Sequence, residues 1–210
     1  MHIPLPRGLY AITDGPRHDL IHACESALAG GARLLQYRDK TGASSRRRDE
    51  ARALRTLCSA HGVALVVNDD VELAREVGAD GVHLGEDDTV IAAARAILGP
   101  DAIIGASCYD SLERARRMAA AGADYLAFGA FFPSPTKPAA RRATPELLVA
   151  ARSLGRPLVA IGGITPDNAA PLVAAGADLI AAISAVFGAS DVRSAASRFA
   201  SLFSRTMDTP

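Results

Sequence analysis

The segment Gln36-Tyr37-Arg38-Asp39-Lys40 follows a short apolar run and holds side-chain types that bind a polyanion. If the run is a strand, its side chains alternate between two faces, so Gln36, Arg38 and Lys40 share one face. A guanidinium and an ammonium beside an amide suit the oxygens of a diphosphate. The same pattern also fits a solvated strand end, with Asp39 paired to a neighbouring helix.

Acidic residues follow two later apolar runs, as Asn68-Asp69-Asp70 and as Glu86-Asp87-Asp88. Magnesium takes one or two carboxylates from a protein and fills its other positions with water and phosphate oxygens. Carboxylates at neighbouring strand ends, beside the cationic segment, would therefore provide for magnesium-bound diphosphate. A structural role is also open, since Asp70 and Asp88 are each placed to cap a helix. We interpret His83, just before the second group, as a core residue.

Hydroxyls and glycines mark the ends of the remaining runs. Ser107 ends one run, where it either contacts a ligand or caps the next helix. The long segment 131–145 has the length of a lid or binding loop. The Ser134 and Thr136 hydroxyls and the Lys137 ammonium, in a loop stiffened by Pro135, suit the recognition of a phosphate. Gly162-Gly163 and Ile183-Ser184 end the last two runs, where barrel enzymes often bind phosphate through backbone N–H groups. These residues together predict two anion sites, one with magnesium and one without.

Eight short apolar runs alternate with longer segments rich in Ala and Arg, which predicts strands and helices in turn. The expected strands are residues 8–13, 33–38, 64–68, 81–84, 103–107, 125–128, 158–161 and 179–184. The expected helices include residues 45–60, 90–98, 111–120 and 166–174. Strict alternation predicts a parallel α/β sheet, which eight units close most simply as a single (β/α)8 TIM barrel. An open doubly wound sheet is the alternative, but no G-x-G-x-x-G follows the first run.

A tripeptide repeat supports the closed barrel. Gly-Ala-Asp occurs at residues 78–80, 122–124 and 176–178, and a degenerate copy, Gly-Ala-Arg, occurs at 31–33. Each copy ends a predicted helix and enters an even-numbered strand, where glycine adopts the left-handed conformation that ends a helix. A fourfold repeat of two β/α units is what an eightfold barrel leaves in the sequence.

The composition argues against a strongly charged or membrane-spanning protein. The 210 residues carry 23 basic and 23 acidic side chains, so no overall field draws the chain to nucleic acid or a membrane surface. Three cysteines without zinc or redox spacing, and a start unlike a signal peptide, lead us to expect a cytoplasmic protein with reduced thiols. We expect one domain over residues 1–205 and a disordered tail at 206–210. A homodimer is compatible with these features.

From residue 8 to residue 184 the chain resembles the thiamine phosphate synthase family. The motifs that carry the resemblance are Gln36-x-Arg38-x-Lys40, Asn68-Asp69, Asp80-Gly81-Val82-His83-Leu84-Gly85, Ser134-x-Thr136-Lys137 and Ile161-Gly162-Gly163-Ile164. Members of that family are (β/α)8 barrels that join a hydroxymethylpyrimidine diphosphate to a thiazole phosphate and release diphosphate. This chain carries Glu86, Ser134 and Ala130 where many members carry Gln, Thr and Pro.

The resemblance implies roles for individual residues. It places the pyrimidine diphosphate on Gln36, Tyr37, Arg38, Asp39, Lys40, Asn68, Ser107 and Lys137. It places the thiazole phosphate on Ser134, Pro135, Thr136, Gly163, Ile183 and Ser184. It implies Mg²⁺ as the cofactor, held by Asp69 and Asp88. Arg38, Lys40 and Lys137 are the expected catalytic residues, because cations stabilise the departing diphosphate.

The reaction that the resemblance implies needs little acid–base chemistry. The pyrimidine CH₂–O bond breaks, the ring delocalises the carbocation and the thiazole nitrogen attacks, so positioning and electrostatics supply most of the catalysis. Two alternatives stay open. One is a thiazole tautomerase-like isomerase of the same barrel superfamily, which would keep only the thiazole phosphate site. The other is a non-catalytic sensor of phosphate ligands.

Overall fold

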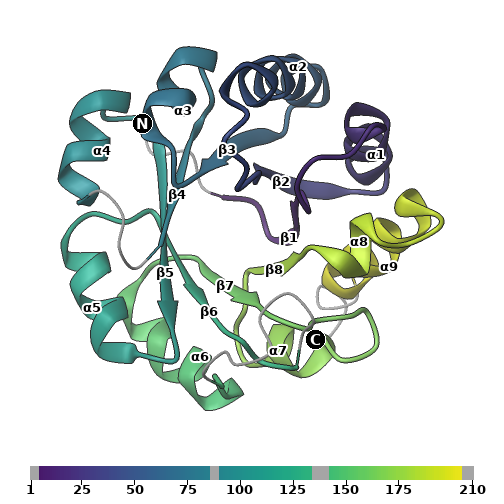
Figure 1. Cartoon of the computed structure of the whole chain (residues 1–210). Coiled ribbons are helices and arrows are strands. Elements are labelled where there is room, and N and C mark those ends of the chain that lie inside the picture. Colours follow the sequence, from purple (N-terminus) through teal and green to yellow (C-terminus); the bar gives the residue numbers. More distant parts are fainter. Residues whose placement is uncertain (1–4, 86–89, 134–141, 205–210) are drawn as a thin grey trace.

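Eight parallel strands close into a barrel in chain order within the part of the chain that the structure describes, residues 5–85, 90–133 and 142–204 (Figure 1). In this computed structural model the strands are β1 (Gly8–Ile12), β2 (Ala32–Tyr37), β3 (Ala64–Asn68), β4 (Gly81–Leu84), β5 (Ile103–Tyr109), β6 (Tyr125–Phe128), β7 (Leu158–Ile161) and β8 (Leu179–Ala182). The helices are α1 (Leu20–Ala29), α2 (Ser44–His61), α3 (Val71–Val77), α4 (Ile91–Leu98), α5 (Leu112–Ala120), α6 (Pro145–Ala151), the 3-10 helix η1 (Arg152–Leu154), α7 (Ala170–Ala174), α8 (Ser184–Phe187) and α9 (Val192–Ser204). The helices form a ring around the strands, which confirms the predicted TIM barrel.

The predicted strands are all present among the described residues, with bounds that differ by at most two residues at either end. The clearest difference is at the last strand, where β8 ends at Ala182 and Ser184 already begins the short helix α8. The helix predicted at 166–174 begins only at Ala170. The reason is a turn before it, in which the side chain of Asn168 accepts a hydrogen bond from the Thr165 N–H over 2.8 Å.

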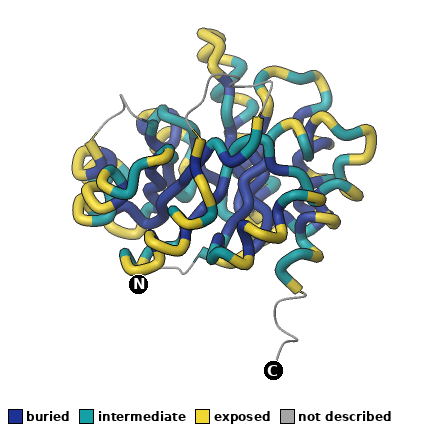
Figure 2. Tube along the Cα trace, turned by 90° about the horizontal axis from the view of Figure 1, so that it is seen from below, coloured by how far each residue is buried: buried dark blue, intermediate teal, exposed yellow. Residues whose placement is uncertain are grey.

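Strand side chains alternate between two apolar cores. The inner core fills the barrel and includes Tyr10, Leu34, Val66, Tyr125 and Leu179. The outer core lies between the strands and the helices and includes their sequence neighbours Leu9, Leu35, Val67, Leu126 and Ile180. Figure 2 shows the result as buried strands surrounded by helices whose outer sides are exposed. Because the alternation has a period of two, it also decides which polar residues at the strand ends face the barrel axis.

The Gly-Ala-Asp repeat marks the N-terminal end of the barrel. The glycines that end the preceding helices all have positive φ angles, namely 98° at Gly31, 64° at Gly78, 95° at Gly122 and 108° at Gly176. These angles agree with the predicted role of glycine at the end of a helix, since a residue with a Cβ rarely adopts them.

The aspartate of each full repeat has a role that we did not predict from the sequence. Its carboxylate accepts a hydrogen bond from a backbone N–H near the start of the preceding strand. These bonds are Leu65 N–H to Asp80 (2.7 Å), Ile104 N–H to Asp124 (2.6 Å) and Leu158 N–H to Asp178 (2.9 Å). The repeat therefore ties each of β4, β6 and β8 to the strand before it, at the end of the barrel that serves stability.

The three cysteines are free and buried, in agreement with the expected reduced thiols. Burial raises the pKa of the Cys58 and Cys108 thiols to about 12, which leaves them protonated and unreactive at neutral pH. None of the helices in the described ranges combines the length and the apolar character that a membrane span requires.

Candidate active site

Polar side chains replace the inner apolar core where the C-terminal ends of the strands meet. Asn68 of β3 lies in register beside His83 of β4. The Nε2 atom of His83 is 2.9 Å from the hydroxyl oxygen of Ser107 on β5. Gln36, two residues beyond the inner-core Leu34, faces the same interior and is 2% exposed. The structure thus brings Gln36, Asn68 and Ser107, all predicted ligands, to one mouth of the barrel.

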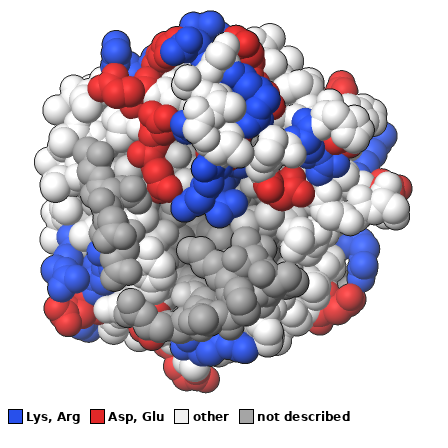
Figure 3. Space-filling view, viewed as in Figure 1, with Lys and Arg blue, Asp and Glu red and all other residues white. Residues whose placement is uncertain are grey.

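Charged side chains gather on this face of the barrel although the whole chain has no net charge. The chain as a whole carries equal numbers of basic and acidic side chains. In Figure 3, Lys and Arg atoms lie next to Asp and Glu atoms over α2 and α3, in the upper part of the view. Anion binding on this face therefore depends on which individual cations can leave their carboxylate partners for a ligand.

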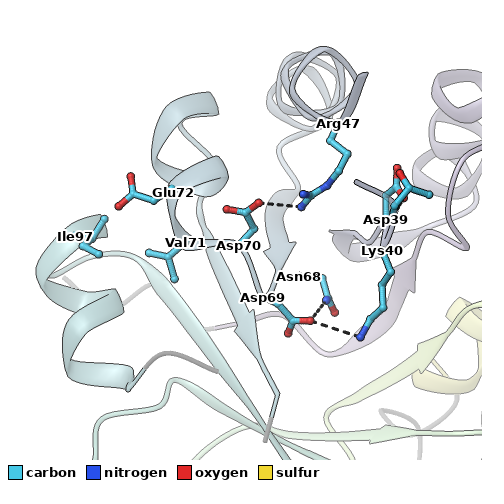
Figure 4. Close-up of a pocket in the computed structure, with 10 residues that line it drawn as sticks. Asp39, Lys40, Arg47, Asn68, Asp69, Asp70, Val71, Glu72 and Ile97 are labelled. Atoms are coloured by element: carbon cyan, nitrogen blue, oxygen red, sulfur yellow. Dashed lines mark hydrogen bonds and ion pairs between the residues drawn. The ribbon is translucent and has the colours of Figure 1, made fainter. Parts of the chain in front are cut away.

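An open pocket of about 610 Å³ lies over the ends of β2 and β3 (Figure 4). The Lys40 side chain points toward Asp69 there, with its Nζ atom 3.7 Å from the Asp69 Oδ2 atom. Asn68 donates a hydrogen bond to that same oxygen over 2.5 Å. The Lys40 side chain is 62% exposed, so its ammonium can turn to an incoming anion at small cost. The pocket has the size of a small-molecule site.

Asp69 is one of the two carboxylates that the sequence predicts for magnesium, and the structure places it beside Asn68 at the end of β3. Its backbone has a φ of 64°, a conformation uncommon for a residue with a side chain, so the chain turns sharply at the end of β3. The described residues contain no cluster of three or more His, Cys, Asp or Glu that could hold a metal ion. Magnesium requires only one or two protein carboxylates when phosphate oxygens complete its shell. Asp69, with Asn68 beside it, fits part of such a donor set.

Arg38 is held through its own peptide groups by Thr13, a residue that we did not predict as part of the site. The Thr13 side-chain oxygen accepts a hydrogen bond from the Arg38 N–H over 2.7 Å. Its hydroxyl donates to the Arg38 carbonyl over 3.0 Å. The Thr13 N–H donates to the Gln36 carbonyl over 3.0 Å. These bonds continue the β1–β2 pairing past the strand ends, so the backbone that carries both predicted ligands is fixed.

The Tyr37 and Asp39 side chains both contact helix α2, and Asp39 also lines the pocket over β2 and β3. The Tyr37 hydroxyl donates to Glu50 over 2.6 Å, and burial raises the pKa of that phenol. The Asp39 side chain is 0% exposed and its carboxylate lies 2.6 Å from the Arg46 guanidinium. Burial alone would raise the pKa of Asp39, but hydrogen bonds from Thr41 and Arg46 lower it overall. Both side chains are thus engaged by α2 and the loop before it, and their roles as ligands stay predictions from the sequence.

For Asp70 and Ser107 the sequence left open whether each caps a helix, and the structure answers this for both. Asp70 caps α3, which confirms the structural role that the sequence left open for it. Its carboxylate also pairs with Arg47 over 2.9 Å. Ser107 does not cap a helix, because Ser111 caps α5. The Arg114 guanidinium donates to the Ser107 carbonyl over 2.7 Å, which holds the end of β5.

The ends of β7 and β8 form the other half of the mouth. β7 and β8 pair in register as far as Ile161 and Ala181, and Gly163 and Ile183 each follow two residues later along the chain. A Cβ on Gly163 would lie 2.3 Å from the Pro133 carbonyl oxygen, so the turn after β7 can pack there only with glycine. Ile183 and Ser184 stand at the start of α8. A glycine turn and a short extra helix at this position commonly bind phosphate through backbone N–H groups.

Several predicted ligands lie outside the described residues. They are Asp88, Ser134, Pro135, Thr136 and Lys137. Glu86 and the expected tail at 206–210 also lie outside them. Their roles stay predictions from the sequence.

A hydrogen-bonded chain of side chains lies directly below the mouth, and we did not predict it. It contains Tyr10, Tyr125 and His83, the residue that we interpreted as part of the core. His83 is half-buried and both of its ring nitrogens have partners, Tyr125 and Ser107, which agrees with a structural role but extends it to the edge of the mouth. Burial raises the pKa of both phenols, which therefore stay protonated. A signal was available, because all three fall on inward positions of predicted strands, and polar atoms inside a barrel need partners.

Comparison with known proteins agrees with this geometry. Residues 9–186 match the family model described as thiamine monophosphate synthase. The thiamine-phosphate synthase of Xanthomonas campestris pv. campestris strain 8004 is 58% identical over 186 residues, which cover 88% of this chain and 90% of that protein. The thiamine-phosphate synthase of Thiobacillus denitrificans is 55% identical over 201 residues, which cover 94% and 95%. The solved structure of thiamine phosphate pyrophosphorylase from Pyrococcus furiosus superposes with a TM-score of 0.86 at 39% identity, covering 95% of this chain and 96% of that one.

The fold and the mouth define a TIM-barrel enzyme with a pocket lined by charged side chains at the C-terminal ends of its strands. The family match covers most of the chain, and the similarity to curated relatives extends along nearly its whole length. The chain belongs to the thiamine-phosphate synthase family, whose enzymes are transferases.

Proposed function

We propose that this protein joins a hydroxymethylpyrimidine diphosphate to a thiazole phosphate, yielding thiamine phosphate and diphosphate. The observation that carries the proposal is the division of the mouth into two halves. Arg38, Lys40 and Asp69 stand at the ends of β2 and β3, whereas Gly163 and the start of α8 follow β7 and β8. One half suits a diphosphate and the other suits a monophosphate.

The proposed reaction is a substitution at the pyrimidine methylene carbon. The CH₂–O bond breaks, and its electron pair leaves with the diphosphate. The lone pair of the thiazole nitrogen then forms the new C–N bond, which makes the thiazolium cation without any proton transfer. Arg38 and Lys40 stabilise the charge of the departing diphosphate, and Lys137 is the third cation that the sequence predicts for this role.

The binding roles follow from where the structure holds each side chain. Gln36 and Ser107 face the barrel interior from β2 and β5, where they can meet the pyrimidine ring. Backbone N–H groups near Gly163, Ile183 and Ser184 hold the thiazole phosphate, which orients the thiazole nitrogen toward the pyrimidine. Fixing both reactants in this way replaces a bimolecular encounter with an oriented one.

We propose Mg²⁺ as the cofactor, held by Asp69 and by Asp88. The support from the structure is the Asp69 carboxylate, which lines the pocket next to Asn68 and Lys40. When bound, magnesium would share the negative charge of the diphosphate oxygens. We further propose that the protein works in the cytoplasm on small molecules, and not on nucleic acid or at a membrane. A homodimer is the proposed assembly.

The test is an assay of the purified protein with both substrates and Mg²⁺, in which thiamine phosphate is separated and quantified. We expect thiamine phosphate only when both substrates are present. Isomerisation of the thiazole phosphate without any thiamine phosphate would support a tautomerase instead. Binding of either ligand without turnover would support a non-catalytic sensor, and either result would refute the proposal.

A further inference from the structure

A continuous chain of hydrogen bonds crosses the barrel interior and connects two of the predicted pyrimidine ligands. The Gln36 amide nitrogen donates to the Tyr10 hydroxyl, which lies 2.8 Å from the Tyr125 hydroxyl. The Tyr125 hydroxyl is 2.9 Å from His83 Nδ1, and His83 Nε2 is 2.9 Å from the Ser107 hydroxyl. The chain thus runs from β2 through β1, β6 and β4 to β5.

The packing around this chain leaves its members little freedom. The Tyr10 and Tyr125 rings meet edge to face at 90°, and the His83 ring stacks on Tyr125 at 18° with centroids 5.5 Å apart. Tyr10 and Tyr125 are 1% and 0% exposed. Gly105 makes room for the Tyr125 hydroxyl end, since a Cβ there would lie 1.9 Å from the Tyr125 Cζ atom.

The distances alone allow either direction along the chain, and we select one from the orientation of the Gln36 amide, whose nitrogen lies on Tyr10. Because the Tyr10 oxygen accepts from the Gln36 amide, its own hydrogen is directed to Tyr125. The Tyr125 hydrogen is then directed to His83 Nδ1, which must be unprotonated to accept it. His83 therefore carries its hydrogen on Nε2 and donates to Ser107. Ser107, having accepted, keeps its hydroxyl hydrogen to donate elsewhere.

The opposite direction conflicts with the position of the Gln36 amide nitrogen. It would bring two donors, Gln36 and Tyr125, to the Tyr10 oxygen and turn the Tyr10 hydrogen away from both partners. Tyr10 is buried, and a phenol hydrogen left without an acceptor in such a place is destabilising. Buried phenols also stay in the neutral form that this chain requires, because burial raises the pKa of Tyr10 and Tyr125.

We propose that Tyr10, Tyr125 and His83 are positioning residues that set the hydrogen-bond polarity of the pyrimidine site. They fix the amide of Gln36 with its oxygen available as an acceptor, and they fix Ser107 as a donor. A 4-aminopyrimidine edge presents an N–H donor beside a ring-nitrogen acceptor, which matches this pair. A ring with a carbonyl in place of the amino group would present an acceptor where Gln36 offers one. This inference rests on the proposed function for the identity of the ligand, but the polarity of the chain does not depend on it.

The polarity is tested first by NMR on the free protein, without any substrate. In protein labelled with ¹⁵N-histidine, long-range ¹H–¹⁵N spectra at about pH 8, above the ordinary histidine pKa of about 6.5, report which ring nitrogen carries the hydrogen. A His83→Gln variant assigns the signal. We expect the Nε2–H form for His83, and a mixture of tautomers in Tyr125→Phe, which lacks the donor to Nδ1. An Nδ1–H form, or no change in Tyr125→Phe, would overturn the proposal whatever the activity of the enzyme.

The consequence for the ligand is tested by steady-state kinetics of Tyr10→Phe, Tyr125→Phe and the double variant. Each single change removes only a hydroxyl and interrupts the connection between Gln36 and Ser107. We expect the KM for the pyrimidine diphosphate to rise about tenfold in each, the equivalent of one buried hydrogen bond. The KM for the thiazole phosphate should stay within about twofold. In the double variant this KM for the pyrimidine diphosphate should rise by about as much as in either single variant, because one change already interrupts the chain of hydrogen bonds.

A matched control separates positioning from loss of stability. Leu126→Val changes the neighbour of Tyr125 that faces the outer core, so it lowers stability without touching the chain. We expect unchanged KM values for both substrates in this variant. Equal increases for both substrates in the Phe variants, or effects that multiply in the double variant, would show that the tyrosines only fill space. If wild-type protein makes no thiamine phosphate while the NMR result holds, the proposed function fails and the polarity assignment stands.

Discussion

The Thr13 hydroxyl makes two hydrogen bonds to the peptide groups of Arg38, and Thr13→Val removes both while keeping the shape of the side chain. Thr13 is 1% exposed, so water does not replace them. At about 1–1.5 kcal/mol for each bond, the variant should lose about 2–3 kcal/mol of unfolding free energy. For a chain of this size that corresponds to a fall in Tm of about 4–12 °C.

The same change should also affect substrate binding, because the Arg38 backbone loses the contacts that fix it beyond the end of β2. We expect the KM for the pyrimidine diphosphate to rise about tenfold and the KM for the thiazole phosphate to stay nearly constant. Thermal unfolding and steady-state kinetics measure the two effects. Thr13→Ser is the matched control, since it keeps the hydroxyl and should keep most of both properties. The reasoning is refuted if the Val and Ser variants behave alike.

Three further predictions concern the barrel, the metal and the loop cation. Asp124→Asn should lower the unfolding free energy by about 2 kcal/mol, because the carboxylate is 7% exposed and binds both Arg95 and the Ile104 N–H. Denaturant unfolding should show a smaller loss for Asp178→Asn, whose side chain is 34% exposed, and equal losses would contradict the role of burial. Asp88→Asn should raise the Mg²⁺ concentration needed for half-maximal activity without lowering Tm, and normal activity at low Mg²⁺ would mean that Asp88 only caps a helix. Lys137→Ala should lower kcat far more than it weakens binding of the thiazole phosphate, measured by titration, whereas a loss of that binding alone would assign Lys137 to the other half of the site.

The sequence predicts the positions of the strands well because a strand in a closed barrel has one simple period. The alternation that places Leu34 inside and Leu35 outside also places Gln36 inside and Tyr37 outside. The sequence alone therefore predicts which side chains of the segment 36–40 face the barrel interior and which face the helices. The engagement of Tyr37 and Asp39 by α2 is a consequence of this alternation.

What the sequence does not give are contacts between strands that are distant along the chain. Tyr10 and Tyr125 are separated by 115 positions, and only closure of the barrel brings their hydroxyls within 2.8 Å. Thr13 stands 25 positions before Arg38, and its role depends on the register between β1 and β2. The hydrogen-bond partners of His83 likewise lie on other strands and become known only from the closed barrel. The hydrogen bonds that Asp124 and the other repeat aspartates accept from the preceding strand could not be predicted for the same reason.

The most direct measurement of the central claim is the stoichiometry of the reaction with both substrates and Mg²⁺. The two-site account predicts that thiamine phosphate and diphosphate form in equal amounts, and that Arg38→Ala lowers both together while the thiazole phosphate still binds. Release of diphosphate without thiamine phosphate, or conversion of the thiazole phosphate with no diphosphate released, would contradict it.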